Sequence, residues 1–88
     1  MLEDLKIILG LNNDDYDQYI QVLIDSCKED LKSVGIASSI VDNPTNLIQV
    51  AIMTYVKAEF DDVNKAGLQE AYNIQKDNLR RKAIYIDV

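Results

Sequence analysis

The strongest constraint on the fold of this chain is an apolar stripe that repeats with the period of an α-helix. Its members are Tyr16, Tyr19, Ile20, Leu23, Ile24, Cys27, Leu31 and Val34. Side chains at this spacing gather on one face of a helix, and burial of that face holds the helix in place. Gly35 follows the last member and suits the end of a helix. We therefore predict one long amphipathic helix that ends at Gly35.

Polar residues mark the start of this long helix. Asn12 or Asn13 is placed to cap it, and three acids follow where the helix dipole favours negative charge: Asp14, Asp15 and Asp17. The stretch has a faint likeness to a calcium-binding loop, but it lacks the required glycine and the bidentate glutamate. No Cys/His set for zinc is present. We therefore predict capping residues here and no metal site.

A short helix precedes the long one, and a third helix follows it. Leu2, Leu5 and Leu9 share one face of a two-turn helix that Gly10 ends. In the third helix, Pro44 takes the first position after a cap at Asn43, and the buried face consists of Leu47, Ile48, Ala51, Ile52, Tyr55, Val56 and Phe60. Further apolar residues lie off that face, so this helix is either central to the domain or partly turned toward a partner: Val50, Met53 and Ala58.

The C-terminal part predicts a fourth helix over residues 65–82. Its apolar side consists of Leu68, Ala71, Tyr72, Gln75 and Leu79. Asn64 caps it, and Asp61 and Asp62 fall in the preceding loop, because acids are unfavourable at the C-terminus of a helix. The last turn suits cations, and the residues found there are Arg80, Arg81 and Lys82.

Two segments carry no helical stripe. Residues 36–43 predict an irregular connector, with Ile36 and Ile40 turned toward the core. Residues 84–88 alternate as a β-strand would, but the chain offers no second strand, so we expect this tail to bind another chain or a groove. The predicted fold is all-α: a small bundle of about four helices, one short and N-terminal, two long and central, and one C-terminal. It forms one domain over residues 1–83 with an extended tail over residues 84–88.

Charge is distributed unevenly along the chain. The sequence holds 15 acids, 9 bases and no histidine, for a net charge of −6. Residues 1–34 carry −5, residues 35–62 carry −3 and residues 63–88 carry +2. This balance disfavours non-specific DNA binding and attraction to anionic membranes. A subunit that is acidic at one end and basic at the other can pack head-to-tail into rings or filaments, although such asymmetry is also common in small proteins without that role.

The sequence lacks the combinations of residues that enzymes commonly use for catalysis. Histidine is absent and Cys27 lies on the apolar stripe, so the common pairs of nucleophile and base are missing. A single cysteine fits a reducing cytoplasm. No basic and apolar leader opens the chain, and the longest apolar runs are far shorter than a membrane span. We predict a soluble protein that is not an enzyme and binds no cofactor.

The order of these features resembles the phage head–tail connector (adaptor) family of tailed phages and prophages, also labelled DNA-packaging proteins. The matching residues are Leu2-Glu3-Asp4-Leu5-Lys6, Asn13-Asp14-Asp15-Tyr16-Asp17-Gln18-Tyr19-Ile20, Leu31, Gly35-Ile36, Pro44, Leu47-Ile48, Ala51-Ile52, Tyr55-Val56-Lys57-Ala58-Glu59-Phe60, Tyr72 and Leu79. The resemblance implies a non-enzymatic subunit of the virion neck that is assembled in the host cytoplasm. About a dozen copies would form a ring beneath the portal protein, join it to tail-completion proteins and continue a channel through which DNA passes without specific binding.

Two groups of residues are candidates for contacts with other subunits or with the portal. The first lies off the core stripe of the third helix and consists of Val50, Met53 and Lys57. The second lies at the end of the chain, which the resemblance assigns to the portal contact: Arg80, Arg81, Lys82, Tyr85 and Ile86. An alternative hypothesis is an acidic regulatory binding module or a DNA-mimic inhibitor, which would be a monomer or dimer with acids at phosphate-like spacing.

Overall fold

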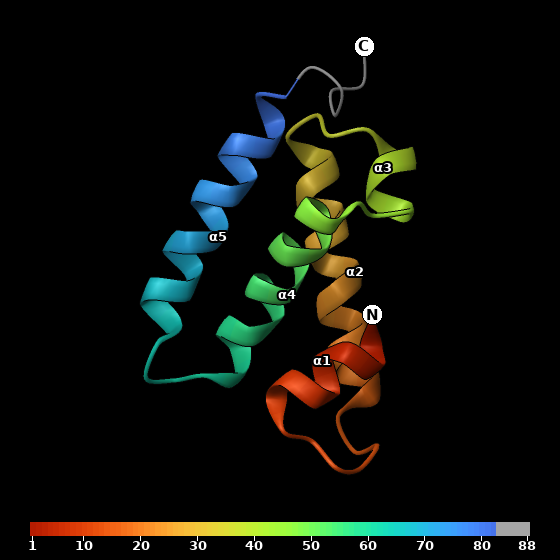
Figure 1. Ribbon diagram of the computed structural model, residues 1–88, viewed down its shortest axis with the longest axis vertical. Helices are drawn as coiled ribbons and strands as arrows, with labels where there is room; N and C mark the ends of the chain where they lie inside the picture. The colour runs from red at the N-terminus through yellow and green to blue at the C-terminus, as the bar shows by residue number, and fades with distance from the viewer. Residues whose placement is uncertain (83–88) are drawn as a thin grey trace.

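The computed structural model describes residues 1–82 of the chain. In that part five α-helices follow one another: α1 (Leu2–Leu9), α2 (Asp17–Ser33), α3 (Ser38–Asp42), α4 (Asn46–Phe60) and α5 (Lys65–Arg80). Figure 1 shows α4 and α5 as an antiparallel hairpin, with α2 beside α4 and α1 near the lower end of α2. The predicted all-α bundle is confirmed. The predicted tail, residues 84–88, lies outside the described residues.

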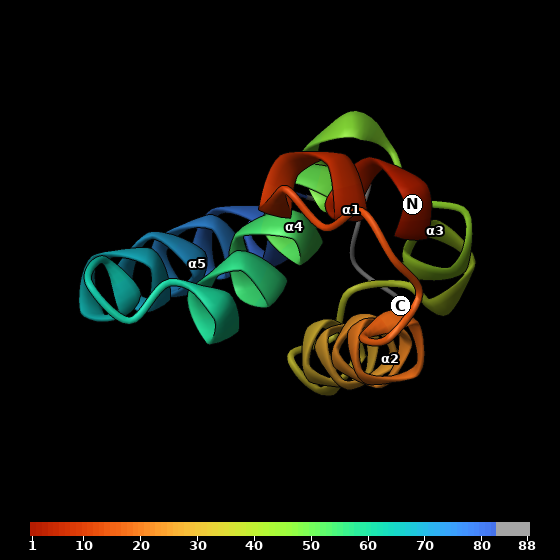
Figure 2. The same ribbon diagram turned by 90° about the horizontal axis from the view of Figure 1, so that it is seen from below.

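Helix α4 occupies the centre of the bundle, which is the first of the two explanations that its wide apolar surface allowed. Helices α1, α2 and α5 all pack against it, and Figure 2 shows α5 and α2 on different sides of it. Its buried side chains are Ile48, Ala51, Ile52, Val56 and Ala58. Full burial of a Val or Ile side chain stabilises a fold by about 1.5–3 kcal/mol. The interior of the domain is therefore organised around α4.

Helix α2 buries most of the apolar stripe that the sequence predicts. Its buried members are Ile20, Leu23, Ile24, Cys27 and Leu31. Tyr16 and Tyr19, the first two members, stay about half exposed. Both pack edge-on against Phe60 of α4, with ring centroids 5.8 and 5.7 Å from the phenylalanine ring. Helix α2 thus packs against α4, α3 and α1, and the aromatic cluster adds a contact with α4 at the start of the stripe.

The predicted start of the long helix is wrong by about one turn. Helix α2 begins at Asp17, and Tyr16 precedes it without a side-chain capping bond. Asn13 Oδ1 instead accepts the backbone N–H of Asp15 at 3.0 Å, inside the loop. Asn13 therefore serves the loop and does not cap the helix, and of the three acids only Asp17 lies in the first turn.

The same loop fastens α1 to the bundle. Lys6 Nζ lies 2.5 Å from Asp14 Oδ1 and 3.0 Å from Asp17 Oδ1. Hydrogen bonds to the two carboxylates raise the pKa of Lys6, which keeps the ammonium of this buried residue charged. Leu5 is fully buried. Gly10 ends the helix in the left-handed region with φ 72°, as predicted, and donates its N–H to carbonyls of the last turn.

The connector between α2 and α4 contains a helix that the sequence does not predict. Helix α3 is shorter than two turns, so an apolar stripe of helical period cannot develop in it. Ile36 and Val41 are buried, and Ile40 is partly buried against the core. The expected packing of Ile36 and Ile40 against the core is therefore confirmed.

The two helices of the hairpin begin close to the predicted positions. Helix α4 begins at Asn46 and not at Pro44, because Thr45 still has an extended backbone with φ −68° and ψ 171°. Helix α5 begins after Asn64, as predicted, but the Asn64 side chain makes no capping bond, and the helix ends at Arg80 and not at Lys82. Asp61 follows α4, and its carboxylate accepts the backbone N–H and the side-chain amide of Asn64 at 3.1 and 3.0 Å. Asp61 is thus part of the loop.

Candidate functional site

A groove lies between the start of α4 and the end of α5, which the hairpin places side by side. This α4–α5 groove has a volume of about 480 Å³ and is lined by Leu47, Val50, Gln75, Asn78, Leu79, Arg81 and Lys82. Leu47 and Val50 are 51% and 50% exposed although both are large and apolar. Apolar side chains that stay exposed in a concavity are typical of surfaces that bind partners. The groove is the candidate assembly surface of the chain.

The groove brings together three of the predicted contact residues, which are Val50, Arg81 and Lys82. Met53 is partly buried against the core, and Lys57 is exposed on α4. Neither of them lines the groove. The candidates Tyr85 and Ile86 lie outside the described residues.

The cations at the end of α5 are partly neutralised by an acid of the same helix. Arg80 Nη2 lies 2.6 Å from Asp77 Oδ1, and Arg81 Nη2 lies 2.9 Å from Asp77 Oδ2. Spacings of three and four residues place such pairs on one helix face, so the sequence contained this signal. Two arginines share one carboxylate, and Lys82 makes no ion pair within residues 1–82. This edge of the groove therefore keeps a net positive charge.

Four residues of the groove are not among the predicted contact residues: Leu47, Gln75, Asn78 and Leu79. The prediction that Leu47 belongs to the buried face of α4 is wrong, because the first turn of α4 leaves half of this side chain uncovered. Gln75 Oε1 is buried and, among residues 1–82, has no hydrogen-bond partner. The only signal for Gln75 is its place among the apolar residues of its helix face.

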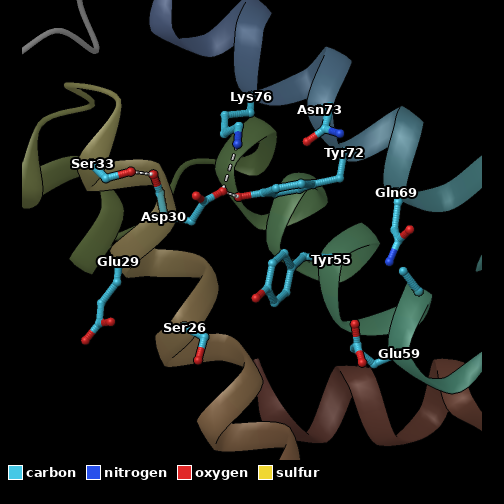
Figure 3. Close-up of a pocket in the computed structure, with 11 residues that line it drawn as sticks. Ser26, Glu29, Asp30, Ser33, Tyr55, Glu59, Gln69, Tyr72, Asn73 and Lys76 are labelled. Atoms are coloured by element: carbon cyan, nitrogen blue, oxygen red, sulfur yellow. Dashed lines mark hydrogen bonds and ion pairs between the residues drawn. The ribbon is translucent and has the colours of Figure 1, made fainter. Parts of the chain in front are cut away.

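A second concavity, more polar, separates α2 from α5 (Figure 3). This polar cleft measures about 620 Å³ and is lined by Ser26, Glu29, Asp30, Ser33, Tyr55, Ala58, Glu59, Gln69, Tyr72, Asn73 and Lys76. Tyr72 donates its hydroxyl hydrogen to Asp30 Oδ2 at 2.7 Å, and Lys76 Nζ lies 3.0 Å from the same oxygen. Behind them, the thiol of Cys27 donates to the hydroxyl of Tyr72 at 3.5 Å. These bonds tie α5 to α2 across the cleft.

The pKa values in the polar cleft follow from burial and from this network. Burial raises the pKa of Cys27 to about 12, so the thiol is neutral near pH 7 and is not an activated nucleophile. Burial and the hydrogen bond to Asp30 raise the pKa of Tyr72 well above its usual range. Burial also raises the pKa of Asp30, but the hydrogen bonds from Tyr72 and Lys76 outweigh it and hold that pKa below its usual value. The neutral phenol of Tyr72, the ammonium of Lys76 and the carboxylate of Asp30 together hold α5 against α2. We call these three residues the latch.

Two further findings concern ligands and membranes. Among residues 1–82, no group of three or more potential metal-ligating side chains lies together. In the same part of the chain, every helix is too short or too polar to cross a bilayer.

Comparison with known proteins identifies the family. No curated protein and no solved structure matches the chain. The family model described as "Phage connector protein" matches residues 1–84. That match covers nearly all of the chain, including the groove and the polar cleft, and it confirms the resemblance in the order of the sequence features. The chain therefore belongs to the phage connector protein family.

Proposed function

We propose that this chain is a structural, non-catalytic subunit of the virion neck of a tailed phage or prophage. In this proposal copies of the chain form an oligomeric ring beneath the portal protein, join it to tail-completion proteins and continue the DNA channel. The protein reaches the neck from the host cytoplasm during assembly. The observation that carries the proposal is the match to the phage connector family over residues 1–84.

The α4–α5 groove supports an assembly role. Leu47 and Val50 stay half exposed in a concavity, which costs solvation free energy in an isolated subunit and is relieved when a partner covers them. Arg81 and Lys82 at the same groove add charge that can orient a partner. A small domain that keeps such a surface gains stability from assembly.

The charge of the chain supports passage of DNA without specific binding. The net charge is −6, and Asp77 neutralises part of the only basic cluster by pairing with Arg80 and Arg81. Firm attachment to DNA depends on many Lys/Arg–phosphate contacts. An acidic channel wall would instead let the duplex slide.

The DNA-mimic alternative has weaker support. A mimic needs rows of acids that are free to replace phosphates, yet several acids here are engaged in ion pairs with bases of the same chain: Asp14, Asp17, Asp30, Asp42, Glu59 and Asp77. Assembly with the portal separates the two hypotheses.

The test is assembly on purified portal protein. The chain alone, and the chain mixed with portal, are measured by sedimentation velocity and imaged by negative stain. We expect a ring of added density beneath the portal. A chain that stays monomeric in both settings, with no added density, contradicts the proposal. The genes on either side give an independent check, since portal and capsid genes nearby favour a connector.

A further inference from the structure

The α4–α5 groove combines an apolar wall with a cationic edge. Leu47 and Val50 form the exposed apolar part, and Leu79 is 3% exposed beneath them. Arg81 and Lys82 line the same groove, and after pairing with Asp77 the end of α5 keeps an excess of positive charge. A matching partner would present apolar side chains next to acids.

The outward face of α1 has that composition. Glu3, Asp4, Ile7 and Ile8 are all exposed, with Ile7 78% and Ile8 51% exposed. Glu3 and Ile7 stand four residues apart, as do Asp4 and Ile8, so the four side chains form two adjacent rows on the helix. We call them the α1 outer face. Within residues 1–82, no cation pairs with either of its acids.

The α1 outer face is held rigidly enough to serve as a docking surface. The opposite side of α1 is buried through Leu5 and through Lys6, which pairs with Asp14 and Asp17. The other exposed apolar residues near acids form no such pair: Tyr16 and Tyr19 pack against Phe60, which leaves Val22 as the single one on α2. Val63 lies in the loop after α4, and Ile74 is the single one on α5. Two neighbouring isoleucines on an anchored helix therefore distinguish α1.

We propose that the α1 outer face of one copy docks into the α4–α5 groove of the next copy. Ile7 and Ile8 would cover Leu47 and Val50, and the two acids of α1 would face the cationic edge. Helix α1 and the end of α5, which borders the groove, lie toward opposite ends of the long axis (Figure 1). One subunit can therefore use both surfaces at once. A contact between different surfaces is heterologous and generates a closed ring or an open filament.

This contact rests on the proposed ring and specifies how neighbouring subunits meet in it. It also accounts for the charge split along the chain, because the acidic N-terminal part of each copy meets the basic C-terminal part of its neighbour.

Cysteine cross-linking tests the contact directly. The double variant Ile8→Cys/Val50→Cys keeps Cys27, which is fully buried. It is assembled on portal, oxidised mildly and run on a non-reducing gel, beside each single variant. We expect a ladder of covalent multimers from the double variant and no multimers from either single variant. Dimers from both single variants in equal amounts would indicate a symmetric contact and overturn the inference.

Imaging of the same samples separates this inference from the proposed function. A ring without a ladder overturns the contact and leaves the connector role in place. A ladder without a ring supports the contact and contradicts the proposed ring. Neither ladder nor ring overturns both.

A charge exchange gives a second test. We expect each of two double variants, Glu3→Lys/Asp4→Lys and Arg81→Glu/Lys82→Glu, to raise the protein concentration needed for assembly by about tenfold or more. A chain that carries all four substitutions should assemble at the concentration of the natural chain, because the opposite charges face each other again. Glu70→Lys, which changes an exposed acid of α5 outside both surfaces, is the matched control and should assemble as the natural chain does. Failure of the combined variant to recover, with an unchanged melting temperature, overturns the inference.

Discussion

Tyr72 of α5 donates its hydroxyl hydrogen to Asp30 of α2 across 2.7 Å, and this bond spans the polar cleft between the two helices. Helix α5 buries only Tyr72 and Leu79, and most of its packing is against α4. The position of α5 relative to α2 therefore depends on one polar cluster. Lys76 completes that cluster through its ion pair with the same carboxylate.

Removal of the phenolic hydroxyl should destabilise the fold without creating a large cavity. We expect Tyr72→Phe to lower the free energy of unfolding by about 1–2 kcal/mol, because Asp30 loses a donor and the Cys27 thiol loses its acceptor. Urea unfolding followed by circular dichroism measures the change. Tyr55→Phe is the matched control, since its ring packs against Tyr72 but its hydroxyl makes no hydrogen bond within residues 1–82. Equal stability of the two variants would refute the role of the latch.

Acid should weaken the same latch. The pKa of Asp30 is held below its ordinary value of 3.8 in the folded chain, where Tyr72 and Lys76 bind the carboxylate. A carboxyl with a depressed pKa contributes stability that is fully present above its unfolded pKa and is lost as pH falls through its folded pKa. The free energy of unfolding should therefore decline as pH falls below about 4.

The variant Asp30→Asn isolates the contribution of this carboxyl. It should be less stable than the natural chain near neutral pH and show a flatter decline in acid, because one titrating group of the folded state is gone. Asp62→Asn serves as control, since Asp62 is exposed and makes no ion pair in the described part of the chain. If the free energy of unfolding falls equally steeply in acid for Asp30→Asn and for the natural chain, the Asp30 carboxylate does not stabilise the fold in the way described.

The buried thiol should be almost inert while the chain is folded. Burial raises the pKa of Cys27 from 9.0 to about 12, so its thiolate fraction near neutral pH is lowered by about a thousandfold. We expect its reaction with a disulfide reagent to be at least about that much slower in the native protein than in denaturant. A cysteine at the half-exposed position 50, in Val50→Cys, should react rapidly in the native state. Fast native labelling of Cys27 would show that the core opens easily.

The sequence predicts the helices well where they carry many apolar residues. The stripe of α2 and the wide apolar surface of α4 are visible because burial repeats over several turns. Helix α3 is too short to show a helical period in its apolar residues. The start of α2 depends on the preceding loop, in which Asp14 forms an ion pair with Lys6 of α1. An ion pair across a loop has no spacing rule, so the sequence could not reveal it.

The candidate site could be predicted only in part, for a related reason. Val50, Arg81 and Lys82 stand out individually, as an apolar residue off the stripe and as cations at a helix end. Their meeting in one groove depends on the register of the α4–α5 hairpin, which periodicity within each helix does not encode. For the same reason the exposure of Leu47 becomes visible only once the end of α5 is placed beside it.

Substitution of two valines of α4 should affect assembly and stability separately. Val50 is 50% exposed in the groove, whereas Val56 is fully buried in the core. We expect Val50→Arg to change the free energy of unfolding by no more than about 0.5 kcal/mol, because a surface substitution leaves the core intact. Its assembly on portal should require about tenfold more protein or fail, since the arginine places like charge beside Arg81 and Lys82 and removes apolar contact.

Val56→Ala should show the opposite pattern. It removes two buried methyl groups, leaves a cavity and should cost about 2 kcal/mol of stability. Below its melting temperature it should still assemble, because the groove is untouched. Unfolding in urea and sedimentation with portal, measured on both variants, give the two quantities. If Val50→Arg assembles normally while Val56→Ala does not, the groove is not the assembly surface and the exposed residues of another face must carry the contact.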